Sequence, residues 1–113
     1  MTDAARLARL QQLAEMKRDH DMARLNRLST ACDTTRDKVE KLAQPLPLTE
    51  DPSLFAARQS HLAWATAQRM QLNVTLATQR AHMIEQREKT ARSFGRAEAL
   101  QKLRDRLARK GSR

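Results

Sequence analysis

Hydrophobic and polar residues follow one another along this 113-residue chain with a helical period, and one short segment interrupts the pattern. All three prolines lie in that segment, within residues 45–52. Because proline lacks a backbone N–H and clashes with the preceding helical turn, no helix continues through the segment. The sequence therefore predicts a single all-α hairpin over residues 1–113. Its two long helices, at about residues 3–44 and 52–109, form an antiparallel coiled coil around a loop at 45–51.

The first helix has an apolar stripe in its second half, with the spacing of a coiled coil. The stripe positions are Leu25, Leu28, Cys32, Thr35, Val39 and Leu42. A second apolar block, from Leu7 to Ala14, lies in the first half, and the five polar residues 17–21 separate the two blocks. The hydrophobic residues of the two blocks do not share one heptad register. We therefore expect a stutter, where the supercoil relaxes locally.

The second helix begins with a capping pattern in which Asp51 suits the N-cap and Pro52 the first helical position, with Ser53 as the alternative cap. Its predicted seam advances by alternating steps of four and three residues. The seam positions are Ala63, Ala67, Met70, Val74, Ala77, Ala81, Ile84, Glu88 and Ala91. Ile84 is the bulkiest residue of this seam, and we expect it in the core, opposite residues 10–13.

The lengths of the two helices set the expected register. A tight connection that places Gln44 opposite Ser53 would place Leu7 opposite Thr90. The first helix would then end opposite residues 93–95, beside the only glycine inside either helix, where we expect a bend or fraying. The rest of the second helix would form an unpaired basic tail with three leucines, Leu100, Leu103 and Leu107. So short a helix is marginal alone, and we expect it to fold against another molecule.

The net charge of +9 is concentrated near the chain termini. Residues 31–86 carry six basic and six acidic side chains, whereas residues 1–30 have a net charge of +2 and residues 87–113 a net charge of +7. A hairpin brings the two basic segments to the same end. The partner expected there is acidic: a protein rim, a nucleic acid or an anionic membrane.

The sequence has no nucleotide-binding loop, zinc-ligand spacing or catalytic triad, so we expect no enzyme activity, no small-molecule substrate, no cofactor and no metal. His20 and His82 lack companion ligands, and Cys32 is expected to be a small buried residue. A single cysteine fits a reducing compartment. No apolar run is long enough to span a membrane, and the N-terminus lacks a secretory h-region. We therefore expect a cytoplasmic chain.

The design of this chain, a small basic hairpin with a longer C-terminal helix, resembles the FliJ/YscO stalk proteins of flagellar and injectisome type III export. The stretch ARSFGRAEAL, from Ala91 to Leu100, looks like the C-terminal part of family members. The resemblance implies a non-enzymatic stalk that inserts its paired termini into the export ATPase ring. It also implies contacts with the export gate and with chaperones.

We therefore expect a monomeric coiled-coil stalk or adaptor of a type III export apparatus, peripheral to the membrane-embedded machine. The expected partner-binding residues are Arg92, Phe94, Arg96, Leu100, Leu103, Arg104 and Leu107. The alternatives are a nucleic-acid-binding hairpin, a general coiled-coil adaptor or chaperone, and a membrane-surface helix. Arginine mixed with leucine favours a protein groove, because nucleic-acid binders interleave aromatic residues for stacking. Three leucines are few for a membrane anchor.

Overall fold

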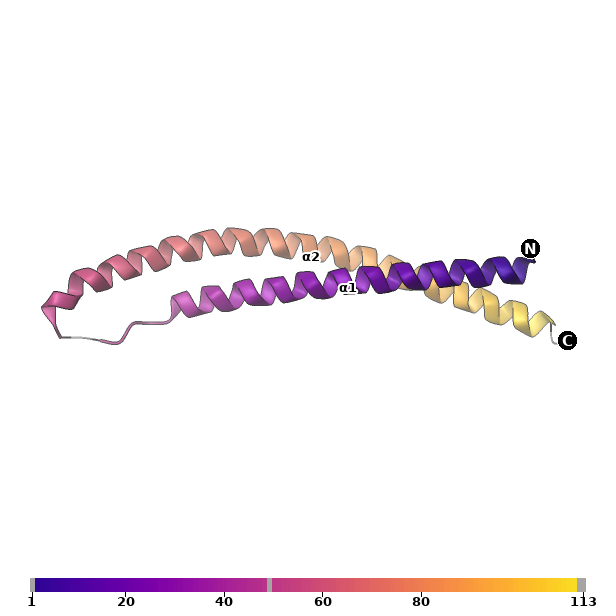
Figure 1. The fold of residues 1–113 in the computed structure, drawn as a ribbon, viewed down its shortest axis with the longest axis horizontal. Helices are drawn as coiled ribbons and strands as arrows, with labels where there is room; N and C mark the ends of the chain where they lie inside the picture. The colour runs from indigo at the N-terminus through magenta and orange to yellow at the C-terminus, as the bar shows by residue number, and fades with distance from the viewer. Residues whose placement is uncertain (1, 49, 112–113) are drawn as a thin grey trace. The chain divides into compact units, whose positions relative to one another are not determined.

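The computed structural model describes residues 2–48 and 50–111, which form two long helices joined by a non-helical segment (Figure 1). Helix α1 spans Asp3–Ala43, the short 3₁₀ helix η1 spans Pro52–Leu54, and helix α2 spans Phe55–Gly111. With 57 residues, α2 is longer than the 41-residue α1. The expected all-α hairpin with a longer C-terminal helix is confirmed.

Side chains cap both helical segments at their N-termini. The Thr2 hydroxyl accepts a hydrogen bond from the backbone N–H of Ala5, at 3.2 Å, and so caps α1. The Asp51 carboxylate accepts bonds from the backbone N–H of Ser53, at 2.9 Å, and from its hydroxyl, at 2.7 Å. These bonds satisfy N–H groups that have no partner within the helix. Of the two caps considered for the second helix, the structure has Asp51, with Pro52 in the first turn.

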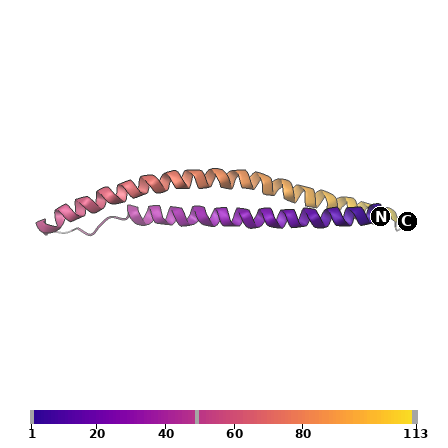
Figure 2. The ribbon, with the colours of Figure 1, turned by 45° about the horizontal axis from the view of Figure 1, so that its top comes forward.

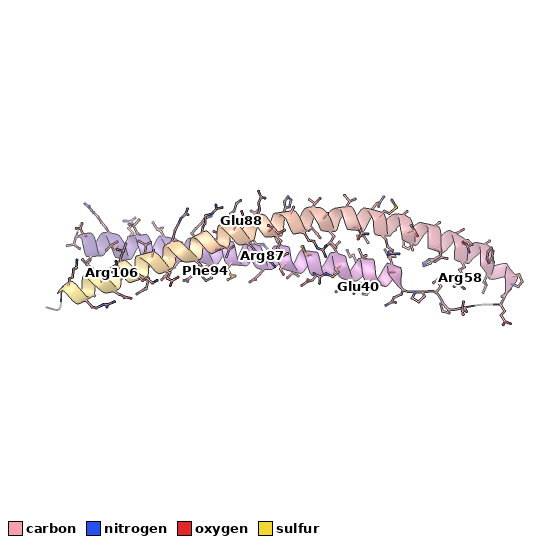
Figure 3. All side chains as sticks on the ribbon, turned by 180° about the vertical axis from the view of Figure 1, so that it is seen from behind. Glu40, Arg58, Arg87, Glu88, Phe94 and Arg106 are labelled. Carbon is pink, nitrogen blue, oxygen red and sulfur yellow. The ribbon has the colours of Figure 1, made fainter. Side chains whose placement is uncertain are left out.

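The connection between the helices is an extended segment that lies alongside the first turns of α2. Arg58 projects from α2 toward this segment, and its guanidinium donates hydrogen bonds to the carbonyls of Pro47, at 3.2 Å, and Leu46, at 3.5 Å (Figure 3). The prolines favour this extended backbone. The connection is therefore not the tight turn that would place Gln44 opposite Ser53.

The chain divides into two compact units, each containing part of both helices. The loop-side unit comprises residues 28–82, and the terminal unit combines residues up to 27 with those from 83 onward. In each unit α1 and α2 lie side by side (Figures 1 and 2). The buried residues of the loop-side unit are Cys32, Thr35, Ala65 and Leu76, and those of the terminal unit are Gln11, Asp21, Gln86, Thr90, Ser93 and Ala97. The loop-side core is thus mostly apolar and the terminal core mostly polar.

The buried face of α1 follows one heptad register along its whole length. Its positions, all buried or half-buried, are Leu7, Gln11, Ala14, Arg18, Asp21, Leu25, Leu28, Cys32, Thr35, Val39 and Leu42. The predicted stripe in the second half is confirmed, but the predicted stutter is wrong. Polar residues occupy seam positions in the first half, while Leu10 and Leu13 are about half exposed. The hydrophobic pattern alone therefore concealed a continuous seam.

The buried face of α2 lies on the other side of the helix from the predicted one. Its buried or half-buried positions include Ala65, Arg69, Leu72, Leu76, Gln79, Met83, Gln86, Thr90, Ser93, Ala97 and Leu100. Each predicted seam position precedes an observed one by two residues, a rotation of about 200° about the helix axis. All nine predicted positions are exposed, including Ile84 at 55%. The prediction of Ile84 as a core residue is therefore wrong.

The register in the terminal unit also differs from the expected one. Thr90, expected opposite Leu7, instead places its hydroxyl 3.3 Å from the backbone carbonyl of Asp21. Farther along, the Gln11 amide donates to the side-chain oxygen of Gln101. Helix α1 therefore accompanies α2 well past residue 95, and α2 continues as an unbroken helix to Gly111. The prediction of an unpaired tail is wrong, and at Gly95 the pairing does not end and α2 does not fray.

Candidate partner-binding surface

A hollow with four basic side chains lies between the two helices of the terminal unit. It has a volume of about 210 Å³, and its lining residues are Lys17 and Asp21 of α1 and Lys89, Arg92, Ser93 and Arg96 of α2. Residues three, four and seven positions apart share one face of a helix, so both helices direct this set toward the same hollow. Two of the predicted binding residues, Arg92 and Arg96, lie here.

The single acidic residue of the hollow is held inside the protein. The Asp21 carboxylate is buried, accepts a hydrogen bond from the Ser93 hydroxyl and lies 3.2 Å from the Lys17 ammonium. The Ser93 hydrogen bond is the main cause that lowers the pKa of Asp21. Burial opposes it, and Lys17 and Gln86 reinforce it. Asp21 is therefore ionised at neutral pH. Its partners Ser93 and Lys17 both belong to the terminal unit.

The remaining basic groups of the hollow are available to a partner. Lys89, Arg92 and Arg96 form no salt bridge with any acidic side chain in residues 2–48 and 50–111. Even with Asp21 counted, the six lining residues have a net charge of +3. A guanidinium binds a carboxylate or phosphate oxygen through two parallel hydrogen bonds. The hollow can therefore accept an anionic group.

Phe94 does not belong to this hollow. It is two residues from both Arg92 and Arg96, so helical geometry directs it to the opposite side of α2. There the Arg18 guanidinium of α1 lies over its ring, 5.6 Å from the centroid. This cation–π contact covers part of the ring, and the residue remains 42% exposed. Phe94, labelled in Figure 3, thus forms a separate contact with Arg18 between the helices.

The three predicted leucines differ in how far α1 covers them. Leu100 is half-buried, whereas Leu103 is 47% and Leu107 38% exposed. Leu107 lines a second hollow, also of about 210 Å³, with Ala4, Arg104 and Ala108. Arg104 is already engaged within the unit, because its guanidinium donates a 2.6 Å hydrogen bond to the side-chain oxygen of Gln11. Of the three predicted leucines, Leu103 and Leu107 therefore offer the most apolar surface to a partner.

The seven predicted residues thus do not form one continuous patch. Arg92 and Arg96 come together at the basic hollow, and Leu107 lines the second hollow. Leu100 is half-buried, Arg104 lines the second hollow and bonds to Gln11 of α1, and Phe94 faces away from the arginines. Sequence reasoning missed Lys17 and Lys89, which complete the basic hollow. Only the register between the helices could have identified Lys17, because it lies in the polar run that was read as a stutter.

A metal site and a membrane span are two other features for which the described residues give no support. Residues 2–48 and 50–111 contain no group of three or more histidine, cysteine or acidic side chains placed to hold a metal ion. Neither described helix combines the length and apolar character needed to cross a membrane. Comparisons with family models, with curated proteins and with solved structures find no match to this chain.

Proposed function

We propose that this protein is a non-enzymatic coiled-coil stalk or adaptor of a type III export apparatus, and that its terminal unit binds the export ATPase ring. The observation that carries the proposal is the basic hollow, together with the partly exposed Leu103 and Leu107 farther along the same helix. Three of its cations lack a salt bridge within the described residues, and these two leucines are only partly covered. Such a surface suits a protein that offers both acidic and apolar groups.

A protein partner fits this surface better than a nucleic acid does. Binding to nucleic acid rests on many phosphate contacts and on aromatic rings that stack with bases. Phe94 is the only phenylalanine, tryptophan or tyrosine in the sequence of the terminal unit, and its ring is partly covered by Arg18. Leu103 and Leu107 offer apolar surface that a phosphate backbone would not use. Nucleic-acid binding by the same cations is the second candidate, and the experiment below distinguishes the two.

The test measures binding of two double variants to the export ATPase of the same organism and to duplex DNA across a salt series. Leu103→Ser with Leu107→Ser should weaken ATPase binding about ten-fold or more, since each loses roughly 1 kcal/mol of apolar burial. Arg92→Gln with Arg96→Gln should mainly slow association and reduce its dependence on salt. In DNA binding the ranking is reversed, and only the arginine variant has an effect.

Matched controls come from the same unit. Leu10→Ser with Leu13→Ser removes two leucines of α1 that are 51% and 54% exposed. Arg24→Gln with Arg27→Gln removes two exposed arginines outside the hollow. Both controls should bind the ATPase as wild type does. The proposal is rejected if the wild-type protein ignores the ATPase, or if the controls weaken binding as much as the site variants.

A further inference from the structure

Helix α2 has a second heptad stripe, on the side that faces away from α1. Within the loop-side unit its positions are Ala63, Ala67, Met70, Val74, Ala77 and Ala81, and all six are exposed. Met70 is 67% and Val74 69% exposed. Each position lies two residues before a seam position, as Val74 does before the buried Leu76. A helix with apolar stripes on two sides is typical of one that packs against two neighbours, and α1 supplies only one of them.

We propose that this outer stripe binds the same stripe of a second copy of the chain, with the two α2 helices antiparallel. In the proposed register, the numbers of facing residues sum to 151. Met70 then faces Ala81 of the second copy, and Val74 faces Ala77. Symmetry repeats both contacts, so the four central layers each pair one large side chain with one alanine. Coiled-coil layers of uniform volume keep the helix separation constant, and this favours a well-packed interface.

Beyond the loop-side unit, the sequence of α2 continues this pairing of one large side chain with one alanine. Heptad spacing places Ile84 opposite Ala67 and the aliphatic stem of Glu88 opposite Ala63. Each of the four large stripe residues from 63 to 88 is thereby matched with one of its four alanines. Sliding one copy by a heptad, to a sum of 158, destroys this match, because Val74 then faces Ile84 and Ala77 faces Ala81. The stripe is thus complementary to itself in one antiparallel register.

Electrostatics also favour the antiparallel arrangement. Six side chains flank the stripe within the loop-side unit, and only one of them is charged. They are Trp64, Thr66, Gln71, Asn73, Thr78 and the charged Arg80. In the proposed register Asn73 lies beside Arg80, and Gln71 beside Thr78, so no like charges meet there. A parallel pair would instead align two segments, residues 87–113, that each have a net charge of +7. Antiparallel pairing directs these segments away from each other.

The interface is short, and this determines how the pairing should behave. The matched layers cover between three and four heptads, about the least that a coiled coil requires. Association between chains of net charge +9 is opposed by repulsion, which salt screens. We therefore expect a reversible dimer that forms as the protein concentration rises and that salt strengthens. Attraction between the basic hollow and an acidic partner has the opposite salt dependence.

Sedimentation equilibrium across a range of protein concentrations and two salt concentrations tests the pairing. The wild-type mass should rise from 12.9 kDa toward twice that value, and more readily at high salt. Met70→Glu with Val74→Glu should keep the protein monomeric. Its helix content and melting temperature should stay close to wild type, because both side chains are exposed. Thr75→Glu, an exposed position on the same helix but outside the stripe, is the matched control and should dimerise.

Disulfide cross-linking tests the register. Val74→Cys and Ala77→Cys are made as separate single variants and then mixed under mild oxidation. Facing positions can approach the separation that a disulfide needs, so the mixture should form a mixed dimer, identified by its intact mass. Each variant alone should cross-link several-fold less. The native Cys32 is buried, and the wild-type protein is the control for cross-links through it.

Three results would overturn the proposal. The first is a wild-type protein that remains at 12.9 kDa at every protein and salt concentration. The second is a glutamate variant that dimerises as wild type does. In the third, Ala77→Cys alone cross-links as efficiently as the mixture, which would indicate a parallel pair. None of these outcomes involves the export ATPase. Failure of the dimer and failure of the proposed stalk function are therefore distinguishable.

Discussion

The hydroxyl of Ser93 on α2 donates a hydrogen bond to the buried carboxylate of Asp21 on α1. Both residues occupy seam positions, where a coiled coil usually buries aliphatic side chains. Around them, Gln86 donates to the backbone carbonyl of Asp21 at 3.2 Å, and the Thr90 hydroxyl lies 3.3 Å from the same oxygen. Such a network stabilises one register, because sliding either helix would leave a buried charge without partners.

Removing the Ser93 hydroxyl should destabilise the protein. Ser93→Ala leaves the buried Asp21 carboxylate without its main hydrogen-bond donor, and we expect a loss of about 1–2 kcal/mol in the free energy of unfolding. Urea titration followed by circular dichroism measures it. Ser60→Ala, at an exposed position of α2, is the matched control and should be neutral or slightly stabilising. Equal effects at both positions would show that the bond contributes nothing.

Asp21 should make stability depend on pH in the acid range. Its pKa is lowered from the usual 3.8, chiefly by the Ser93 hydroxyl, so the folded state favours the ionised form. The resulting stabilisation is complete above the unfolded-state pKa and is lost as the pH falls below about 3.8 through the folded-state pKa. Asp21→Asn should therefore be less stable than wild type at pH 7, with the difference narrowing in acid. A difference that is constant with pH would contradict this assignment.

The observed seam of α2 predicts opposite outcomes for two truncations. Leu76 is 6% exposed, so Leu76→Ala should lower the free energy of unfolding of the protein by about 2–3 kcal/mol. Ile84→Ala should change stability by less than about 0.5 kcal/mol in dilute solution, where the protein is monomeric, because Ile84 is 55% exposed. Thermal or urea unfolding of the two variants side by side provides the measurement. The reverse ranking would mean that α2 is turned the other way.

Gly95 should be replaceable with a gain in stability. It lies inside α2, and a Cβ atom added there would meet nothing within 4 Å. Gly95→Ala should stabilise the protein by about 0.5–1 kcal/mol, because alanine reduces the backbone freedom of the unfolded chain. Melting temperature and urea midpoint are the measurements. A destabilised variant would indicate that the helix departs from regular geometry at this position.

Arg58 should control how firmly the loop lies along α2. Arg58→Ala removes the donor to the Leu46 and Pro47 carbonyls, so the loop should be cleaved faster in limited proteolysis. The helix content should remain unchanged, since these bonds of Arg58 go to carbonyls of the loop and not to either helix. Arg36→Ala, which removes an arginine paired with the exposed Asp33, is the control and should leave loop cleavage unaltered.

The sequence by itself determined the helical elements of this protein. Three prolines between residues 45 and 52 stop any helix, and the flanking residues have a helical period, so both helices and their break were predictable from local chemistry. The stripe from Leu25 to Leu42 was also predictable, because its hydrophobic residues show the heptad spacing directly. The concentration of basic charge near the termini, and with it Arg92 and Arg96 as candidate binding residues, followed from the sequence as well.

Only the tertiary structure decided which face of α2 is buried and how the helices are aligned. Gln86, Thr90 and Ser93 look like surface residues in the sequence, and an alanine-rich stripe on the opposite side shows the same heptad spacing. The polar residues can be buried because groups on α1 satisfy their hydrogen bonds, and no local pattern reveals a partner about 65 to 72 residues away. The same register brings Lys17 to the basic hollow and leaves Met70 and Val74 exposed.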